Sequence, residues 1–411
     1  MINLKKNKIS RKAVYLAVYL FFLLFFTLFG NIGFSALNQM VLWLFGPLLA
    51  IYILEPNLYR IHNIPSEYYL YLSLIVFALL GFINVEQSEP FFRYLKVMVS
   101  NFVLMVVLFY GINSVAEWKL AWITIVITSV VVSFLAFFLD VPTAENEEYF
   151  RLSGLVGNAN GLGNYARIGV LASLILLQFA TKPGLKLFYW LTIIFLSYTI
   201  ILTASRGNFA NLLFVLGTYL IFKYFRGWKI ILLVLALFTV GNIILAYSEQ
   251  FLQGFYLFDR LSKDNSIGSV MDNEMRAKLY LLAWNTFLDH PFLGIGLNQF
   301  QFFSGGHITH TDILDIFVQL GMFAGVIYIS IYVKVFIKIW KLRYALLIKR
   351  DKDIFHLLII LFSSEMLYGT SNANWFSQFN MSILSLIIIY ITKIRTTRPQ
   401  FNVVQSTAAK R

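Results

Sequence analysis

The chain has 411 residues, of which 59% are hydrophobic and only 13% are charged, and its mean hydropathy is +0.73. Soluble globular proteins carry about 25% charged residues, so this composition excludes a soluble enzyme, a disordered chain and a fibrous protein. It predicts an integral membrane protein. The 33 Lys and Arg residues outnumber the 20 Asp and Glu residues by 13, an excess that we interpret as a topology signal rather than as a nucleic-acid site. The absence of cysteine excludes disulfides and thiolate chemistry.

Transmembrane helices are predicted along the whole chain. A bilayer core of about 30 Å needs about 20 apolar residues per helix, and this criterion predicts an all-α polytopic protein with one membrane domain over residues 1–411. The basic amino-terminal segment resembles that of a signal peptide, but no small-residue cleavage site follows it, so we expect an uncleaved anchor. The twelve predicted spans are 13–29, 36–54, 67–84, 95–112, 120–139, 161–180, 186–203, 209–223, 229–247, 312–334, 354–371 and 377–392.

The distribution of basic residues predicts the orientation of these spans. With the amino terminus in the cytoplasm, 24 of the 33 Lys and Arg residues lie on the inner side and 9 on the outer side. The positive-inside rule therefore places both termini in the cytoplasm. Two longer segments, 140–161 and 248–311, are then outer loops, and residues 396–411 form a flexible cytoplasmic tail.

The first polar cluster follows the seventh span, at Ser205-Arg206-Gly207-Asn208. Arg206 is predicted to lie beside the amino terminus of the next helix, where free N–H groups and the helix dipole favour an anion. A guanidinium can hold a phosphate or pyrophosphate there through paired hydrogen bonds, with Ser205 and Asn208 as neighbouring substrate ligands. The alternative is an arginine that only anchors the helix at the lipid headgroups.

The long outer loop contains a second basic cluster. Residues 275–288 have helical periodicity and predict an amphipathic helix that lies on the membrane or caps the bundle. Arg276 on this helix is a candidate second phosphate ligand, and the alternative is a solvated surface charge. A helix end and a tight turn are then predicted at Pro291, Gly294 and Gly296. No strand precedes this Gly-x-Gly sequence, so it does not indicate a nucleotide-binding site.

Two histidines precede the tenth span, in Gly306-His307-Ile308-Thr309-His310-Thr311-Asp312. A neutral His310 at the membrane boundary could act as a general base towards a sugar hydroxyl, with His307 and Asp312 binding substrate. A metal site is a weaker alternative, because His307 and His310 would share a helical face but no third ligand is evident. An interfacial histidine without a chemical role is the remaining interpretation.

A segment rich in Gly and Asn, residues 154–164, precedes the sixth span. Such residues permit left-handed backbone and side-chain hydrogen bonds, so Asn158 and Asn160 could line a polar cavity for a glycan or a phosphate. An ordinary turn between spans is the alternative. Arg167, just inside the span, would be costly against lipid and is predicted to face the bundle.

In chain order these motifs resemble one family. They are Gly-x-x-x-Asn-x-Asn-Gly before a span, Ser-Arg-Gly after the next, and Arg…Pro-x-x-Gly-x-Gly in the outer loop. The pattern ends with His310-Thr311-Asp312-x-Leu314…Leu320-Gly321…Gly325. From about Arg151 to Gly325 the chain resembles the bacterial O-antigen ligase and polysaccharide polymerase superfamily.

The resemblance implies a metal-independent, inverting glycosyltransferase without a cofactor, at the outer face of the bacterial cytoplasmic (inner) membrane. Its donor would be a glycan on undecaprenyl pyrophosphate. Arg206 and Arg276 would bind and neutralise the pyrophosphate, and His310 would activate the acceptor hydroxyl. The implied partners are the bilayer, a glycan or glycolipid acceptor, and assembly proteins such as a flippase or a chain-length regulator, with no nucleic acid.

Within this superfamily the moderate outer loop and the His-Thr-Asp variant favour a polymerase, which adds the chain to another lipid-linked repeat unit. The alternatives are an O-antigen ligase that uses lipid A core, a teichuronic-type polymerase and a protein O-oligosaccharyltransferase. A transporter or flippase would also have twelve spans with both ends inside. The unequal outer loops, and polar groups gathered at one face, favour the transferase over a transporter or a purely structural scaffold.

Overall fold

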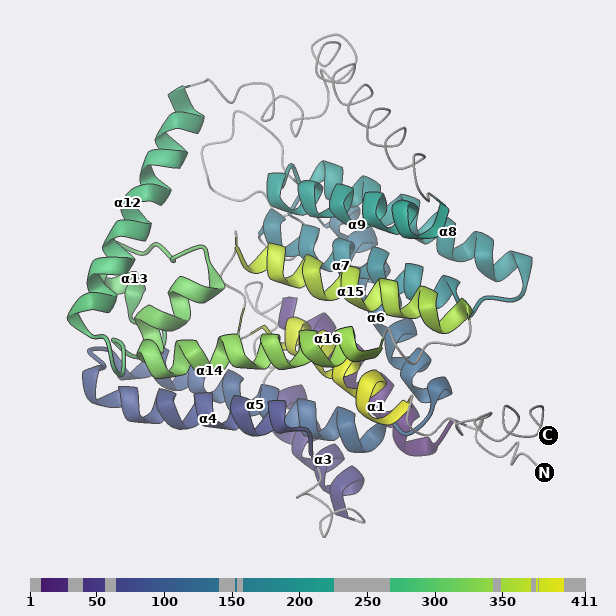
Figure 1. Cartoon of the computed structure of the whole chain (residues 1–411), viewed down its shortest axis with the longest axis horizontal. Coiled ribbons are helices and arrows are strands. Elements are labelled where there is room, and N and C mark those ends of the chain that lie inside the picture. The colour runs from purple at the N-terminus through teal and green to yellow at the C-terminus, as the bar shows by residue number, and fades with distance from the viewer. Residues whose placement is uncertain are drawn as a thin grey trace, which may run out of the picture.

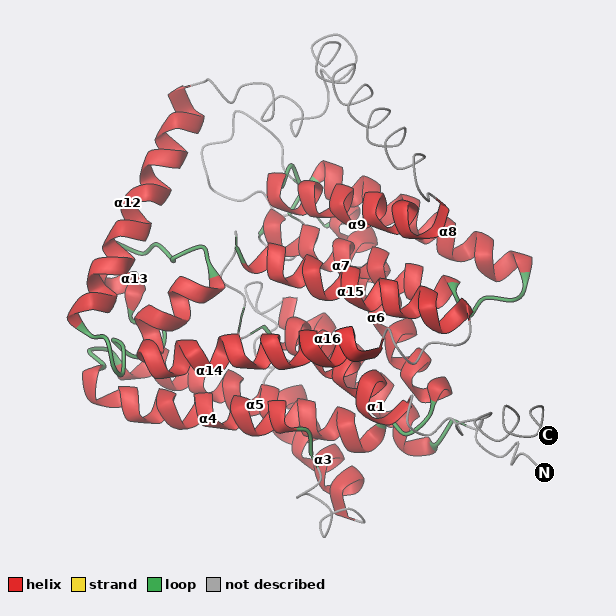
Figure 2. Cartoon of the chain, in the orientation of Figure 1, coloured by secondary structure: helices red, strands yellow, loops and turns green. Residues whose placement is uncertain are grey.

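The computed structural model describes residues 9–28, 40–55, 64–139, 152–153, 158–224, 267–342, 349–370, 375 and 377–394. Every regular element in these ranges is a helix and none is a strand, as Figure 2 shows. The elements are α1 (Arg11–Leu28), η3 (Val41–Phe45), α3 (Gly46–Leu54), α4 (Ser66–Leu80), η5 (Gly81–Asn84), α5 (Ser88–Gly111), α6 (Val115–Phe138), α7 (Ala159–Leu177), α8 (Pro183–Leu202), α9 (Arg206–Tyr224), α12 (Ile267–Asp289), α13 (Phe300–Phe303), α14 (Asp312–Leu342), α15 (Lys349–Gly369), α16 (Gln378–Ile389) and η8 (Tyr390–Ile394).

The all-α class is confirmed for the described residues, and eleven of the twelve predicted spans overlap one of these helices. The predicted span 229–247 lies outside the described residues, so the number of twelve stays a prediction. Five described helical segments are long and apolar enough to cross a bilayer: Ser66–Asn84, Ser88–Gly111, Val115–Phe138, Pro183–Leu202 and Asp312–Leu342, the last of which is interrupted at Gly321.

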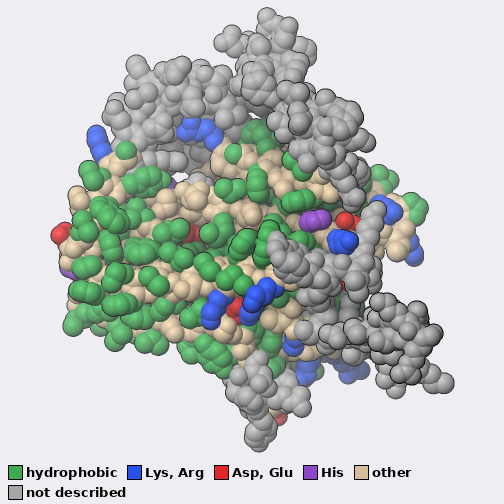
Figure 3. Space-filling view, in the orientation of Figure 1, with side chains coloured by type: hydrophobic (Ala, Val, Ile, Leu, Met, Phe, Trp, Pro, Cys, Tyr) green, Lys and Arg blue, Asp and Glu red, His purple; other side chains and the backbone are tan. Residues whose placement is uncertain are grey.

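The centre of the bundle is formed by α7 and α16, whose side chains are buried along most of their length. A helix that is apolar all round is buried among other helices, and α7 packs against α6, α8 and α9 while α16 packs against α5. The outer helices instead carry many exposed Leu, Ile, Val and Phe side chains. Figure 3 shows that hydrophobic side chains are spread over the visible described surface and far outnumber the charged ones there, as expected for a surface in contact with lipid.

Polar contacts group several helix ends at one end of the bundle. The Ser10 backbone N–H donates to Glu117 Oε1 at 3.1 Å, and Lys393 Nζ donates to Asn113 Oδ1 at 2.7 Å. The start of α1, the start of α6 and the end of η8 therefore lie together. The predicted topology places these positions on one side of the membrane, and the structure agrees with that grouping; the cytoplasmic assignment stays a prediction.

At the other end, α12 crosses the ends of the other helices instead of running along them (Figure 1). Its buried side chains, among them Leu279, Ala283 and Phe287, pack with Val318 of α14. The predicted helix at 275–288 is thus present as part of α12, in the position of a cap on the bundle.

A sharp break divides α14 at Gly321, whose φ of 80° and ψ of −179° are non-helical. In a continuous helix Asp312 and Tyr328 would be about 24 Å apart, yet the Tyr328 hydroxyl donates to Asp312 Oδ2 at 3.2 Å. A Cβ on Gly325 would lie 2.5 Å from the Phe317 ring, so the two arms are in close contact. The predicted continuous span 312–334 is therefore corrected to a helical hairpin, because the backbone reverses at Gly321.

The Pro-x-x-Gly-x-Gly motif packs into this break. The N–H groups of Ile295 and Gly296 donate to Val318 and Gln319 carbonyls at 2.9 and 3.0 Å, and Met322 N–H donates to the Pro291 carbonyl at 2.8 Å. These bonds satisfy backbone groups that the broken helix leaves without a helical partner. A side chain on Gly294 would overlap the backbone of residues 318 and 319, so the motif holds the hairpin in place.

Candidate functional site

The Ser205–Asn208 motif lies in the tight turn between α8 and α9, with Arg206 as the first residue of α9. The Ser205 hydroxyl accepts from Asn208 Nδ2 at 3.0 Å, and Arg206 is half-buried. Asn208 is completely buried and donates to the Asn160 carbonyl at 2.9 Å. The turn is therefore fixed against the start of α7, as an anion site at a helix amino terminus requires.

The Gly- and Asn-rich motif forms the start of α7. Asn158 is the N-cap, and its side chain accepts from the Asn160 N–H at 2.9 Å, which satisfies one of the free N–H groups of the first turn. A Cβ on Gly163 would lie 2.6 Å from Asn208 Nδ2, so glycine allows the close approach of α9. The structure thus brings four predicted substrate-binding residues together: Asn158, Asn160, Ser205 and Asn208.

Arg167 is also on α7. Its side chain is completely buried and faces the bundle, as predicted. Its Nη2 forms an ion pair with Glu365 Oε1 at 2.9 Å and donates to Asn164 Oδ1 at 2.6 Å, while Nη1 donates to Ser364. The guanidinium carbon also lies 4.8 Å from the centre of the Tyr368 ring. Its predicted role in substrate binding stays a prediction, because these contacts lie within the protein.

Helix α15 supplies residues that the sequence analysis missed. The Tyr368 hydroxyl donates to the Asn160 carbonyl at 3.4 Å, so one helix contacts both Arg167 and the Asn-rich turn. Glu365 is an ionisable residue in the predicted span 354–371, and such residues are functional candidates by default. Applied to the sequence, this rule for ionisable residues in a span would have identified Glu365 as a candidate.

The segment before α14 holds His310 in an unusual backbone conformation, with φ of 59°. The Thr309 hydroxyl donates to Asp315 Oδ1 at 2.8 Å, and Asp315 Oδ2 accepts from Trp375 Nε1 at 2.7 Å and Gln319 Nε2 at 2.6 Å. Non-glycine residues rarely adopt a positive φ, and such strain persists where neighbouring contacts fix it. Asp315 thus anchors the residue beside His310.

Asp312 connects this segment to α15. It is buried, accepts from Tyr328, and lies so close to Gly369 that any side chain there would overlap its carboxylate. His307 is exposed, and its carbonyl accepts from the Ser304 hydroxyl at 2.5 Å. The two histidines are therefore in different environments. Among the described residues, no group of three or more His, Cys, Asp or Glu side chains is placed to hold a metal ion.

A cavity of about 590 Å³ lies between α12, α14 and α15, beside the His310 segment. Trp284, Leu314, Phe317 and Met366 contribute to its largely apolar wall, and Asp312 and Glu365 also line it. A cavity of this size is within the range of small-molecule sites. Its largely apolar wall suits an apolar ligand.

The third predicted catalytic residue, Arg276, belongs to α12 by its backbone, but its side chain lies outside the described part of the chain. The turn with Arg206 and the segment with His310 are connected through α15, which contacts both the Asn160 carbonyl and Asp312. The convergence of Arg206, Arg276 and His310 on one cavity stays a prediction.

Comparison with protein families identifies the class to which this region belongs. Residues 191–329 match the family model described as O-antigen ligase. These residues are similar to that family. The match extends from α8 through the turn with Arg206, α12 and the His310 segment into α14. The predicted O-antigen ligase and polymerase superfamily is thereby confirmed. No curated protein matches the chain.

Proposed function

We propose that the protein polymerises a surface polysaccharide such as O-antigen, capsule or exopolysaccharide. It would transfer a glycan from undecaprenyl pyrophosphate to another lipid-linked repeat unit at the outer face of the bacterial cytoplasmic membrane. The observation that carries the proposal is the position of the His310 segment: it lies within the residues that match the O-antigen ligase family and beside an apolar cavity in a membrane-type helical bundle. A lipid-linked glycan needs such a juxtaposition of polar and apolar surface.

In the proposed reaction, His310 accepts the proton of the acceptor hydroxyl as its oxygen attacks the anomeric carbon of the donor. The bond between that carbon and the pyrophosphate oxygen breaks, with inversion at the carbon. Arg206 and Arg276 stabilise the charge on the leaving pyrophosphate, because fixed guanidinium groups need no reorganisation when the charge develops. The donor's own pyrophosphate bond supplies the free energy, so the proposal needs no cofactor.

The first test is chain extension by purified protein with a lipid-linked repeat unit. We expect Arg206→Ala, Arg276→Ala and His310→Ala each to abolish extension while the protein still inserts into membranes. Two matched controls replace the same kinds of side chain at exposed positions, Lys278→Ala on α12 and His290→Ala directly after it, and should retain extension. Normal polymer length from any of the three site variants would contradict that residue's assigned role.

The main alternative is an O-antigen ligase, which moves the finished chain to lipid A core. Deletion of the gene separates the two reactions through the surface glycan that remains. A missing polymerase leaves single repeat units on the core, whereas a missing ligase leaves lipid-linked polymer and a bare core. The second pattern would replace the polymerase by the ligase, and an unchanged glycan would contradict both.

A further inference from the structure

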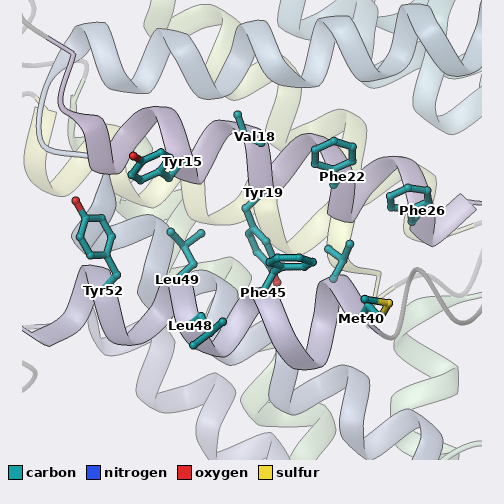
Figure 4. A pocket seen from close by; sticks show the side chains of 11 residues that line it. Tyr15, Val18, Tyr19, Phe22, Phe26, Met40, Phe45, Leu48, Leu49 and Tyr52 are labelled. Carbon is teal, nitrogen blue, oxygen red and sulfur yellow. The ribbon is translucent and has the colours of Figure 1, made fainter.

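A second cavity of about 700 Å³ shares no lining residue with the candidate site and lies between α1 and the helical segment formed by η3 and α3. Its wall is almost entirely apolar, with Phe22 and Val18 contributed by α1 and Phe45 and Leu48 by the facing segment (Figure 4). Val18 and Leu48 are 49% and 57% exposed. The cavity is therefore a groove that is open to the surface of the bundle.

The groove has the length of a lipid chain in one leaflet. Its lining extends along α1 from Tyr15 to Phe26, a rise of about 16 Å at 1.5 Å per residue. Half of a bilayer's hydrocarbon core is about 15 Å thick. A chain that begins at the Tyr15 end would therefore reach about the middle of the bilayer at Phe26.

Basic residues lie at the Tyr15 end of the groove. Arg11 is exposed, and Lys12 Nζ lies 5.1 Å from the centre of the Tyr52 ring, which lines the groove. Glu55 is an acidic residue at the same end of α3, and the two positive charges of Arg11 and Lys12 outweigh its single negative charge. The balance of charge at this end of the groove is positive, so an anionic headgroup is favoured there.

We propose that this groove binds an anionic phospholipid from the leaflet at the Arg11 end. Its phosphate lies at Arg11 and Lys12, and one acyl chain lies between α1 and α3. The charge and the length of the groove are the two features that select this ligand. The site is independent of the proposed transfer reaction, because it shares no residue with the site on α7, α9, α14 and α15.

The test is native mass spectrometry of the full-length protein after delipidation, titrated with dioleoyl phosphatidylglycerol or dioleoyl phosphatidylcholine. We expect the first bound phosphatidylglycerol to have at least a tenfold lower Kd than phosphatidylcholine. A basic residue near an anionic lipid surface contributes about fivefold in affinity, so Arg11→Ala/Lys12→Ala should weaken phosphatidylglycerol binding about 25-fold. The matched control, Lys182→Ala/Lys186→Ala at the start of α8, should leave it unchanged.

A second pair of variants tests the groove itself without changing charge. Val18→Trp/Leu48→Trp fills it and should weaken binding of both lipids, whereas Ile194→Trp, at a 63% exposed position of α8, should not. Equal affinity for the two lipids, or equal losses from the α1 and α8 charge variants, would overturn the proposal. Tighter binding of undecaprenyl phosphate than of phosphatidylglycerol, abolished by the groove variant, would overturn it in favour of a polyprenyl ligand.

Discussion

Loss of either partner of the Arg167–Glu365 ion pair should destabilise the protein strongly. The Arg167 side chain is 0% exposed and that of Glu365 is 9% exposed, with Nη2 and Oε1 2.9 Å apart. Arg167→Met removes this contact, the 2.6 Å hydrogen bond to Asn164 and the contact with the Tyr368 ring. The substitution leaves the Glu365 carboxylate without its cation, and this accounts for most of the expected loss in the free energy of unfolding.

The magnitude follows from this geometry. Removal of one partner of a buried ion pair costs about 3–5 kcal/mol, whereas replacement of both by apolar side chains of similar volume is often neutral. We therefore expect Arg167→Met and Glu365→Met each to lower the free energy of unfolding by about 3–5 kcal/mol. The double variant should stay within about 1–2 kcal/mol of the parent, which gives a coupling energy of about 4 kcal/mol or more.

The assay is reversible unfolding of the four full-length proteins in mixed micelles, analysed as a double-mutant cycle. Lys338→Met tests the same reasoning at a second pair: it breaks the 2.6 Å ion pair with Glu67, whose side chain is 0% exposed although that of Lys338 is 33% exposed. The buried Glu67 carboxylate then also loses its cation, so this variant should likewise lower the free energy of unfolding by about 3–5 kcal/mol. Single variants that cost less than about 1 kcal/mol, or a double variant equal to the sum of the singles, would refute the reasoning.

The same double variant separates structure from function at Arg167. Because the double variant should fold, its chain-extension activity reports on the substrate-binding role that the sequence predicts for Arg167. Loss of chain extension by a stable double variant would support that role. Full activity would show that Arg167 serves only to hold α7 and α15 together.

Three further predictions concern the hairpin, the site and the chemistry. Gly321→Ala places a side chain against the Phe292 backbone at φ of 80° and should destabilise the protein by about 2–6 kcal/mol; Gly217→Ala, which meets open space, should be neutral or slightly stabilising in the same unfolding assay. Asp312→Cys/Gly369→Cys places two Cβ atoms 3.4 Å apart, close to the disulfide range of about 3.5–4.5 Å. Oxidation should therefore link their peptides in mass spectra, with no background because the chain has no cysteine. An Asp312→Cys/Gly184→Cys pair that links equally well would contradict the placement of Asp312 against α15. Chain extension should continue in chelator, and a loss that Mg²⁺ or Mn²⁺ restores would contradict the metal-independent mechanism.

Much of the site could be predicted locally, because helix ends and turns are determined by residues close in sequence. Asn158 acts as an N-cap, Ser205–Asn208 forms the turn before α9, and residues 275–288 are helical. Capping and periodicity depend on neighbours within one or two turns. The motifs from Ser205 to Gly325 also lie within residues 191–329, which match the O-antigen ligase family.

The partners of these elements could not be predicted, because they are distant in sequence. Arg167 and Glu365 are 198 residues apart, and Trp375 reaches Asp315 across 60 positions. Hydropathy identifies a buried charge but not the helix that neutralises it. For this reason the sequence analysis assigned no role to α15, which contacts both the Asn160 turn and Asp312.

The sequence by itself determined that the chain is a helical membrane protein with polar motifs at one end of its spans, because composition and apolar length suffice for that conclusion. Tertiary structure alone decided that the apolar run from residue 312 is a hairpin. Gly321 permits a reversal but does not require one, and the decision comes from the 291–296 segment, whose N–H groups and carbonyls pair with the broken backbone. The net charge of +13 likewise predicted orientation, but only the fold showed that Arg167 is neutralised inside the bundle and that Arg11 and Lys12 lie at the end of an apolar groove.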